Sequence, residues 1–437
     1  MRSIVRGITV VAVGCVALRG AAAGLLPTVH VPEQYSTIQA ALDTVGSGAI
    51  IEVAPGNYGP VTIGRPLDNP YHNPSASNVT LHGVGALIDG GAQAAITVID
   101  GTQVVVDGFT VVSLGVGVNI VRGTDVTVRN VTVQSAGSDG IRADTVTNVT
   151  IVDNRVESAG GTGISLVATT SELFGLLTVS SNTVLAAGGD GIFVHNIGDG
   201  ADTVISDNVV ANVDGRGIRS ECGMTLLVEH NDVSATGGAA VSVVQVFGSC
   251  TVTQNDIADA GGAGVDARDV VRADVSDNRI DRTAGEGVVV SAPSVNVDRN
   301  AITDAGYAGI RILHDFDPGY VVYASLDPDA SISENVVTRP AGSGILLDHA
   351  FPVDVADNTI HAPGIHGIEL DGTRGMRVSR NDVTGAGSCG FRLEHRARNN
   401  VLESNTATDC SPGLWAHGVA KKNHIDGSNH FRKHSRR

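Results

Sequence analysis

From residue 130 onward, apolar and polar positions recur along the chain with one period. In each repeat an Asn is followed by a short apolar strand, a turn of small residues, and then a Gly and an aliphatic residue that open a second strand. Successive Asn positions lie 22 to 28 residues apart, except between Asn300 and Asn335. They are Asn130, Asn154, Asn182, Asn208, Asn231, Asn255, Asn278, Asn300, Asn335, Asn358, Asn381 and Asn405.

This period predicts an all-β fold, a parallel β-helix solenoid of about 12 coils with ~23 residues per coil. One repeat is too short to bury its own apolar face, so the repeats must stack in register and share a continuous aliphatic core. The Asn side chains would then form a ladder of amides along one corner.

Residues 24–66 are expected to cap the solenoid at its N-terminal end. Ser36-Thr37-Ile38-Gln39 matches a capping box, and Ile38, Ala41, Leu42 and Val45 follow on one helical face. An amphipathic helix here would cover the core and the strand edges of the first coil. The repeats are predicted to fill residues 67–418, and residues 419–437 form a basic tail.

The stretch from Val31 to Tyr58, which contains Val53-Ala54-Pro55-Gly56-Asn57-Tyr58, resembles the opening of right-handed β-helix proteins of the pectin-lyase type. The resemblance implies a right-handed solenoid over nearly the whole mature chain. Members of that group include pectate and alginate lyases, polygalacturonases, mannuronan epimerases and surface proteins. The Asp-Pro-His run of the epimerases is not matched, because Asp317-Pro318 is followed by Gly319. No subfamily is assignable.

The composition fits thin aliphatic layers and restricts the partners. Among 437 residues there are 55 Gly and only 3% aromatics, and the net charge is −17. This charge disfavours nucleic acid, and also a polyanionic glycan unless local Arg residues override it. The only Lys residues are Lys421, Lys422 and Lys433, so a lysine base in the body of the chain is excluded.

The N-terminus predicts export. Residues 1–23 match a signal peptide, with an apolar run at 8–18 that is too short to span a bilayer and a cleavage site at Ala21-Ala22-Ala23. We therefore expect a secreted, periplasmic or cell-surface monomer that does not span the membrane. A lipoprotein anchored at Cys15 is the alternative.

The four remaining cysteines predict two disulfides between coils. Cys222 and Cys250 lie in successive repeats, as do Cys389 and Cys410, and adjacent coils are within disulfide reach. The alternative is four buried thiols.

The last coils align polar residues into outward columns, because they keep a period of 23 residues and side chains alternate along a strand. The first column contains Leu346, Glu369, Arg392 and Trp415. The second column contains Asp348, Asp371, Glu394 and His417, with His349 and His395 at the strand ends.

Stacked carboxylates in the second column repel one another, so something must compensate. A shared proton would suit one carboxyl to act as a general acid. A Ca²⁺ ion bound by Asp348, Asp371 and Glu394 is the second possibility, and Arg392 is the third. Trp415, the only tryptophan, is expected to stack on a sugar ring.

The insertion at residues 315–323 is expected to overhang this column and to form one wall of a groove. Most outward polar residues of a solenoid are only a solvated face. A second outward set on the same face is an equal candidate for the site. It contains Arg142, Asp144, His195, Arg219, Glu221, Asp266 and Arg268.

Two functional hypotheses follow. In the first, the chain is a lyase or epimerase for a uronic-acid glycan, in which Arg311 and Arg392 neutralise the sugar carboxylate and His395 or His417 moves the proton. A hydrolase would instead use two of the column carboxylates. In the second, the solenoid is a non-catalytic surface or carbohydrate-binding module. The catalytic candidates are Arg392, His395, His417, Asp371 and Glu394, and the substrate-binding candidates are Arg311, His314, Glu369, Trp415 and Tyr320.

Overall fold

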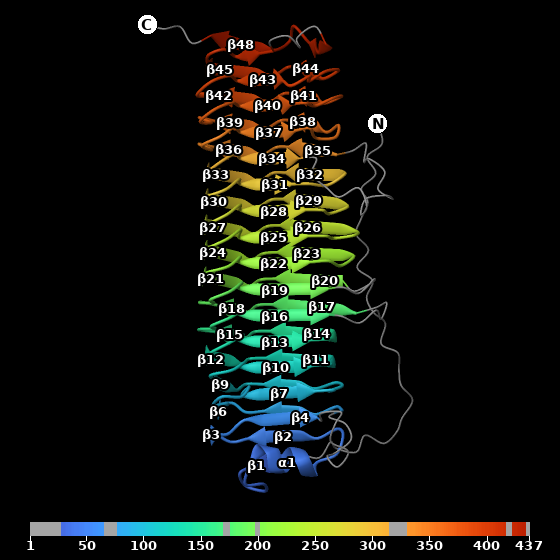
Figure 1. The fold of residues 1–437 in the computed structure, drawn as a ribbon, viewed down its shortest axis with the longest axis vertical. Helices are drawn as coiled ribbons and strands as arrows, with labels where there is room; N and C mark the ends of the chain where they lie inside the picture. The colour runs from blue at the N-terminus through green and yellow to red at the C-terminus, as the bar shows by residue number, and fades with distance from the viewer. Residues whose placement is uncertain are drawn as a thin grey trace.

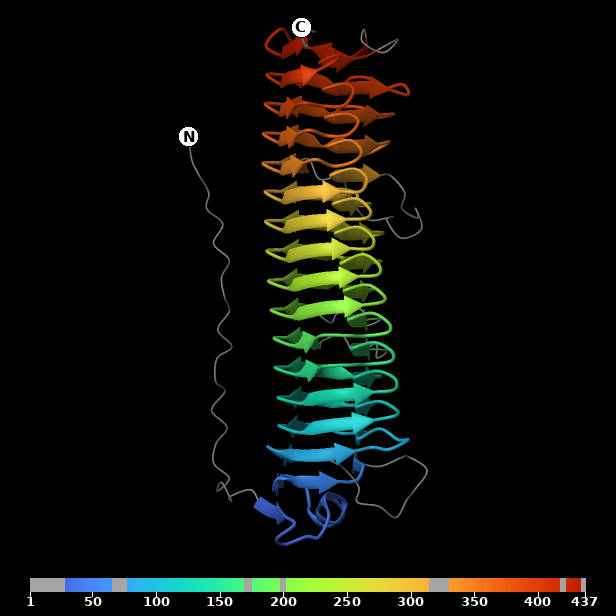
Figure 2. The same cartoon turned by 90° about the vertical axis from the view of Figure 1, so that its left-hand side faces the viewer.

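The chain winds into a right-handed parallel β-solenoid in the computed structural model, which describes residues 28–64, 77–168, 175–196, 202–313, 330–416 and 422–433. The coils stack in chain order from the N-terminal to the C-terminal end (Figure 1), and the stack stays straight when viewed from the side (Figure 2). The predicted fold is confirmed. Among the described residues, no helix is long and apolar enough to cross a membrane.

Each coil contributes one strand to each of three parallel sheets. Sheet A has 17 strands, from β1 (Thr28–Val31) to β47 (His424–Ile425), and sheet B has 16, from β3 (Gly56–Tyr58) to β48 (His430–Lys433). Sheet C has 15 strands and carries the polar columns. Its strands are β4 (Val61–Gly64), β7 (Ile96–Ile99), β10 (Val118–Val121), β13 (Ile141–Asp144), β16 (Ile164–Ala168), β19 (Ile192–Asn196), β22 (Ile218–Glu221), β25 (Val241–Val244), β28 (Val265–Arg268), β31 (Val288–Val290), β34 (Ile310–Leu313), β37 (Ile345–Asp348), β40 (Ile368–Asp371), β43 (Phe391–Glu394) and β46 (Leu414–Trp415).

Two expectations about the repeat need correction. The solenoid has about 16 turns rather than about 12, and each coil has three strands rather than two. The first coils escaped detection because Phe109 and Val131 occupy the corner that Asn fills later. The missed strand of each coil, in sheet A, directly precedes that corner, as β23 (Thr225–Glu229) does.

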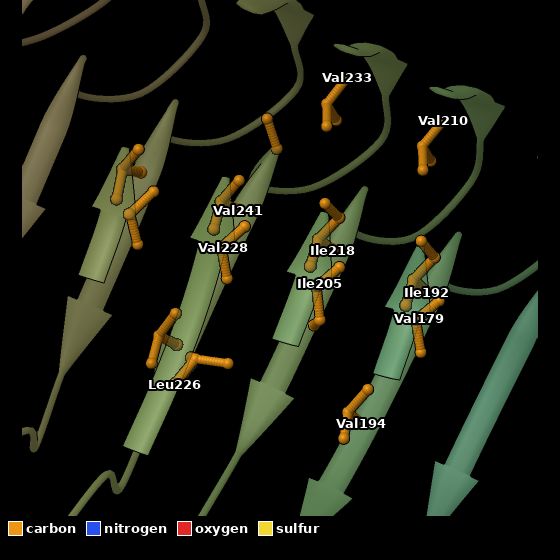
Figure 3. Close-up of a cluster of buried hydrophobic side chains, with 14 of the residues drawn as sticks. Val179, Ile192, Val194, Ile205, Val210, Ile218, Leu226, Val228, Val233 and Val241 are labelled. Atoms are coloured by element: carbon orange, nitrogen blue, oxygen red, sulfur yellow. The ribbon is translucent and has the colours of Figure 1, made fainter. Parts of the chain in front are cut away.

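The core is a repeated layer of aliphatic side chains. Figure 3 shows Val179, Ile205 and Val228 of sheet A stacked beside Ile192 and Ile218 of sheet C. These side chains are fully buried, and the parallel register places each one opposite its equivalent in the next coil. Each coil therefore continues the apolar contacts of the coil before it.

The predicted Asn ladder is confirmed from Asn154 to Asn405 and continues to Asn429. Each Asn offers its side-chain oxygen to the backbone N–H and the amide of the Asn one coil earlier, at 2.9–3.1 Å from the backbone nitrogen. Asn130 does not belong to the ladder. It is exposed and donates to Asp107, while Val131 takes the corner position.

A glycine precedes most sheet C strands because the coils approach closely there. A Cβ on Gly217 would lie 2.3 Å from Cγ1 of Val233 and 2.6 Å from the carbonyl oxygen of Ala240. Both atoms belong to the next coil, so a side chain at this position would push the coils apart.

The predicted capping helix is α1 (Ile38–Thr44), which buries Ile38, Ala41 and Leu42 against the first coils. Its N-cap is Thr37 rather than Ser36, and the Thr37 hydroxyl accepts the N–H of Ala40 at 3.1 Å. The side chain of Gln39 instead hydrogen-bonds to the backbone of Thr62 in β4.

Neither predicted disulfide is present, since all four cysteines among the described residues are free. Cys222 follows β22 in sheet C, whereas Cys250 lies in sheet A opposite Leu226. Cys389 precedes β43 in the turn, whereas Cys410 ends a strand of sheet B. The sequence spacing matched, but the members of each pair lie in different columns of the solenoid.

Candidate functional site

The structure aligns the described members of both predicted columns on the outer face of sheet C. In the first column, Leu346, Glu369, Arg392 and Trp415 are successive register partners, and Arg311 precedes Leu346. In the second, Asp348, Asp371 and Glu394 are successive partners. His314, Tyr320 and His417, the insertion at 315–323 and the signal peptide lie outside the described residues, as do residues 419–421 and 434–437 of the basic tail. Residues 422–433 of the tail are described and add β47 and β48 to the solenoid.

Each carboxylate of the second column has its own basic partner. Asp348 accepts from Arg311 at 2.8 Å and lies 2.9 Å from Nδ1 of His349. Asp371 lies 2.7 Å from Nδ1 of His395. Burial opposes the ionisation of Asp348, but hydrogen bonds from His349 and Arg311 outweigh it and lower the pKa of this carboxyl.

Glu394 is bound by the Arg392 guanidinium in a close contact, two residues along the same strand. The sequence predicts repulsion between the stacked carboxylates, and hydrogen bonds from arginine and histidine side chains offset it.

Glu369 in the first column differs from these carboxylates. Its side chain is mostly buried, as is that of Glu394, and it accepts the Ser343 hydroxyl at 2.7 Å, while its nearest basic atom, Nε of Arg392, lies 3.9 Å away. Burial and the neighbouring Glu394 raise the pKa of Glu369, against the hydrogen bond from Ser343 and the charge of Arg392. The carboxyl with a raised pKa therefore lies in the first column, two residues before Asp371 of the second column, where the sequence suggested a shared proton.

Arg392 connects the two columns. Its guanidinium lies 5.3 Å from the centre of the Trp415 ring, within cation–π range, and Nη1 is 2.6 Å from Nε2 of His366. His366 is almost fully buried, and burial together with the charge of Arg392 lowers the pKa of its imidazole. Nε2 of His366 therefore accepts a hydrogen bond from the Arg392 guanidinium and holds it between Glu394 and Trp415.

Asp371, Glu394 and His395 form one group with the spacing of metal ligands, since one donor atom from each lies within 4.8 Å of the others. Asp348, which the sequence placed with them, is paired instead with Arg311 and His349. The predicted Ca²⁺ binding stays a prediction, and its set of donors would include an imidazole nitrogen.

A second cluster lies on the same two columns, seven coils earlier. Its residues Arg219, Glu221 and His195 belong to the second outward set that the sequence suggested. Arg219 lies 4.9 Å from the centre of the Phe193 ring and donates 2.8 Å to Glu221 through Nε. His195 stands 3.4 Å from Glu221. Arg219 also lies 3.4 Å from Asp190, in the turn before β19, and the neighbouring strands β19 and β25 carry no acid.

The model of the right-handed β-helix region matches residues 69–175, 94–246, 174–321, 242–375 and 315–435, which together span most of the sequence. The chain belongs to the right-handed β-helix family. A search of curated proteins finds no match.

Solved structures similar to this β-helix include the A-module of mannuronan C-5 epimerase AlgE6 from Azotobacter vinelandii, with 17% identity, a TM-score of 0.36, and coverage of 90% of this chain and 93% of that one. The catalytic domain of a GH87 α-1,3-glucanase with nigerose has 13% identity, a TM-score of 0.38, and coverage of 95% and 70%. The catalytic unit of a GH87 α-1,3-glucanase from Streptomyces thermodiastaticus strain HF3-3 has 17% identity, a TM-score of 0.33, and coverage of 94% and 70%. We draw no functional conclusion from likeness at this level.

The residues that precede the glycine in each turn also belong to the site, and the repeat pattern alone did not indicate them. Glu286, Ser343 and His366 hold this position, and each contacts the first-column residue of the following coil, namely Arg311, Glu369 and Arg392 respectively. In the sequence, each of these residues lies 25 or 26 positions before the first-column residue that it contacts. This separation is two or three positions more than the 23-residue repeat. The repeat analysis had treated these positions only as part of the turn.

Proposed function

We propose that this protein is a polysaccharide-active enzyme, and that its site on sheet C, built from Glu369, Asp371, Glu394, Arg392 and Trp415, hydrolyses a glycosidic bond in a neutral glycan. One observation carries the proposal. Three carboxyl groups from two adjacent strands meet on an exposed face beside the only tryptophan of the chain.

The carboxyl groups differ in the way that glycoside hydrolysis requires. Burial and the neighbouring Glu394 raise the pKa of Glu369, so this carboxyl is suited to protonate the leaving oxygen. Asp371 lies 2.7 Å from Nδ1 of His395, and Glu394 is bound by Arg392. One of these two would stabilise the oxocarbenium-like transition state, attack the sugar or activate a water molecule.

The charge of the site favours a neutral glycan over a uronate. Arg392 is held by Glu394 and His366, and Arg311 is held by Asp348 and Glu286 at 2.8 and 3.3 Å. Neither guanidinium is left to neutralise a sugar carboxylate, and the acidic groups outnumber the arginines. Trp415 keeps about a third of its surface exposed and offers a flat apolar surface beside the acids.

The test is release of reducing ends from a panel of neutral glucans, xylans and mannans by the wild type and by Glu369→Gln. We expect turnover by the wild type and a loss of roughly 10²- to 10⁴-fold in the variant, the usual contribution of a general acid. Glu221→Gln is the matched control, because Glu221 forms the same pair with an arginine two residues before it, on the same column seven coils away. Equal loss in both variants, or loss only in Glu221→Gln, would refute this assignment of the site.

Elimination or epimerisation of a uronic-acid glycan is the second candidate. It is favoured by the arrangement of two arginines, Arg311 and Arg392, in one outward column with the acid–base groups. Formation of unsaturated uronate from polyuronates, abolished by Arg392→Ala, would support this candidate against hydrolysis.

Binding of glycan without any turnover, weakened by Trp415→Ala, would support a non-catalytic carbohydrate-binding module instead.

A further inference from the structure

A groove of about 670 Å³ runs along the turn between sheets B and C, away from the columns of the proposed site. It is lined by the ends of β21 (Val209–Val213), β24 (Asp232–Thr236), β27 (Asp256–Ala260) and β30 (Arg279–Thr283), with the residues that follow them, and it reaches Asp304 in β33 (Ala301–Ala305). Four steps between coils correspond to ~19 Å along the axis.

The floor of the groove is made of small residues whose backbone is already paired. The N–H groups of Gly237, Gly261 and Ala284 donate to carbonyl oxygens of the preceding coil at 2.7 to 2.8 Å. A peptide that added itself as a strand would need free N–H and C=O groups, and this floor offers no free N–H at these positions. Recognition in the groove must therefore come from side chains.

The wall of the groove carries the carboxylates of Asp214, Asp259 and Asp304 and the guanidinium of Arg282, with Arg339 beside it. Arg282 donates to both oxygens of Asp259 at 2.7 and 3.0 Å, and Arg339 donates to both oxygens of Asp304 at 2.8 Å. These pairs present alternating donors and acceptors along the axis with no net positive charge. Sugar hydroxyls match such a surface, whereas a polyanion gains nothing from it.

An exposed aromatic ring stands at the end of the groove nearest the proposed site. Tyr307 follows Asp304 by three residues, is 64% exposed, and is held by backbone hydrogen bonds to Gly285 and Gly342. The next strand, β34, carries Arg311 of the first column. Tyr307 thus lies on the turn between β33 and β34 of one coil, two coils before β40, which carries Glu369 of the proposed site.

We propose that this groove binds an extended, neutral polysaccharide chain, with Tyr307 stacking on a sugar ring at the end that leads to sheet C. The groove would retain a long glycan on the solenoid, and a short oligosaccharide that occupies only sheet C would not use it. This inference extends the proposed function to substrate capture, and it stands whether or not the site on sheet C turns over.

The experiment is affinity electrophoresis of the full chain in native gels that contain a soluble neutral β-glucan, α-glucan or xylan, with polygalacturonate as the anionic comparison. Ala284→Arg fills the floor at an exposed position, and Tyr307→Ala removes the ring without adding bulk. Leu114→Arg is the control, because Leu114 is 78% exposed on the same line of turns, well before the groove begins.

We expect one neutral glycan to retard the wild type, Leu114→Arg and Glu369→Gln equally. The apparent dissociation constant should rise roughly five- to tenfold in Tyr307→Ala, the order of one aromatic contact, and at least as much in Ala284→Arg. Retardation unchanged in both groove variants, or retardation by polygalacturonate alone, would overturn the proposal. Binding of extended peptides but of no glycan would overturn it as well. Loss of turnover in Glu369→Gln with retention intact separates the proposed function from the groove.

Discussion

Replacing Asn255 by Ala tests the Asn ladder as the device that fixes one corner of every coil. The Asn255 side chain is 2% exposed, and its oxygen accepts the backbone N–H and the amide of Asn231, both at 3.0 Å. Its amide nitrogen donates to the Asn278 oxygen and to the carbonyls of Val228 and Thr253, at 2.9 to 3.0 Å. The substitution leaves the Asn231 N–H and the Val228 carbonyl short of a partner in the interior.

One buried group without a partner costs about 1 to 3 kcal/mol, so two of them predict a loss of about 2 to 6 kcal/mol in the free energy of unfolding. Urea denaturation measures this loss, and hydrogen exchange at the Asn231 amide localises it. Asn119→Ala is the control, because Asn119 lies partly exposed on the outer face of β10 and should change stability by less than about 0.5 kcal/mol. A loss below about 1 kcal/mol in Asn255→Ala, with unchanged exchange at Asn231, would refute the reasoning.

Three further predictions follow from contacts and pKa shifts. Gly217→Ala should cost about 1 to 3 kcal/mol in urea denaturation, because its Cβ would meet a valine methyl group at 2.3 Å, whereas Gly46→Ala should be nearly neutral because nothing lies within 4 Å. Turnover should fall as pH rises through the raised pKa of Glu369, since the donor is active only while protonated, and a pH profile of kcat/KM without this alkaline limb would contradict the assignment. A thiol reagent should modify Cys222 before Cys250 in the folded protein, because Cys222 is partly exposed while full burial raises the pKa of the Cys250 thiol to about 12, and equal rates would contradict the burial.

The fold was predictable because the positions that repeat are the ones that stacking constrains most. Asn at the corner and Gly before sheet C are each required by a neighbouring coil, so they recur at a readable period. The first coils were missed because their corners hold Phe109 and Val131, which fill the same place with apolar contacts instead of an amide ladder. The sheet A strands were missed because no residue type marks where they begin.

The candidate site was predictable in its columns and not in its contacts. A 23-residue period fixes the register of Glu369 opposite Arg392 and of Asp371 opposite Glu394, and the structure has both. Which carboxyl is buried depends on side-chain reach across coils, and Ser343 and His366 enter from the turn rather than from the strand. The disulfides failed for a related reason, since spacing along the chain does not specify the sheet in which a residue lies.

The described arginines occupy two environments, and Arg392 shares the less exposed one with Arg219, which lies over the Phe193 ring. Arg299 and Arg380 pair with an Asp one coil earlier at exposed corners, and each side chain keeps about half of its surface in water. Such pairs contribute at most about 1 kcal/mol and need no function to explain them. Arg392 is more buried, is shared between Glu394 and the neutral His366, and lies over Trp415. Burying this guanidinium costs desolvation free energy, and its contacts hold an acid, an imidazole and an exposed ring in fixed positions on the surface. A functional site explains that cost better than stability does.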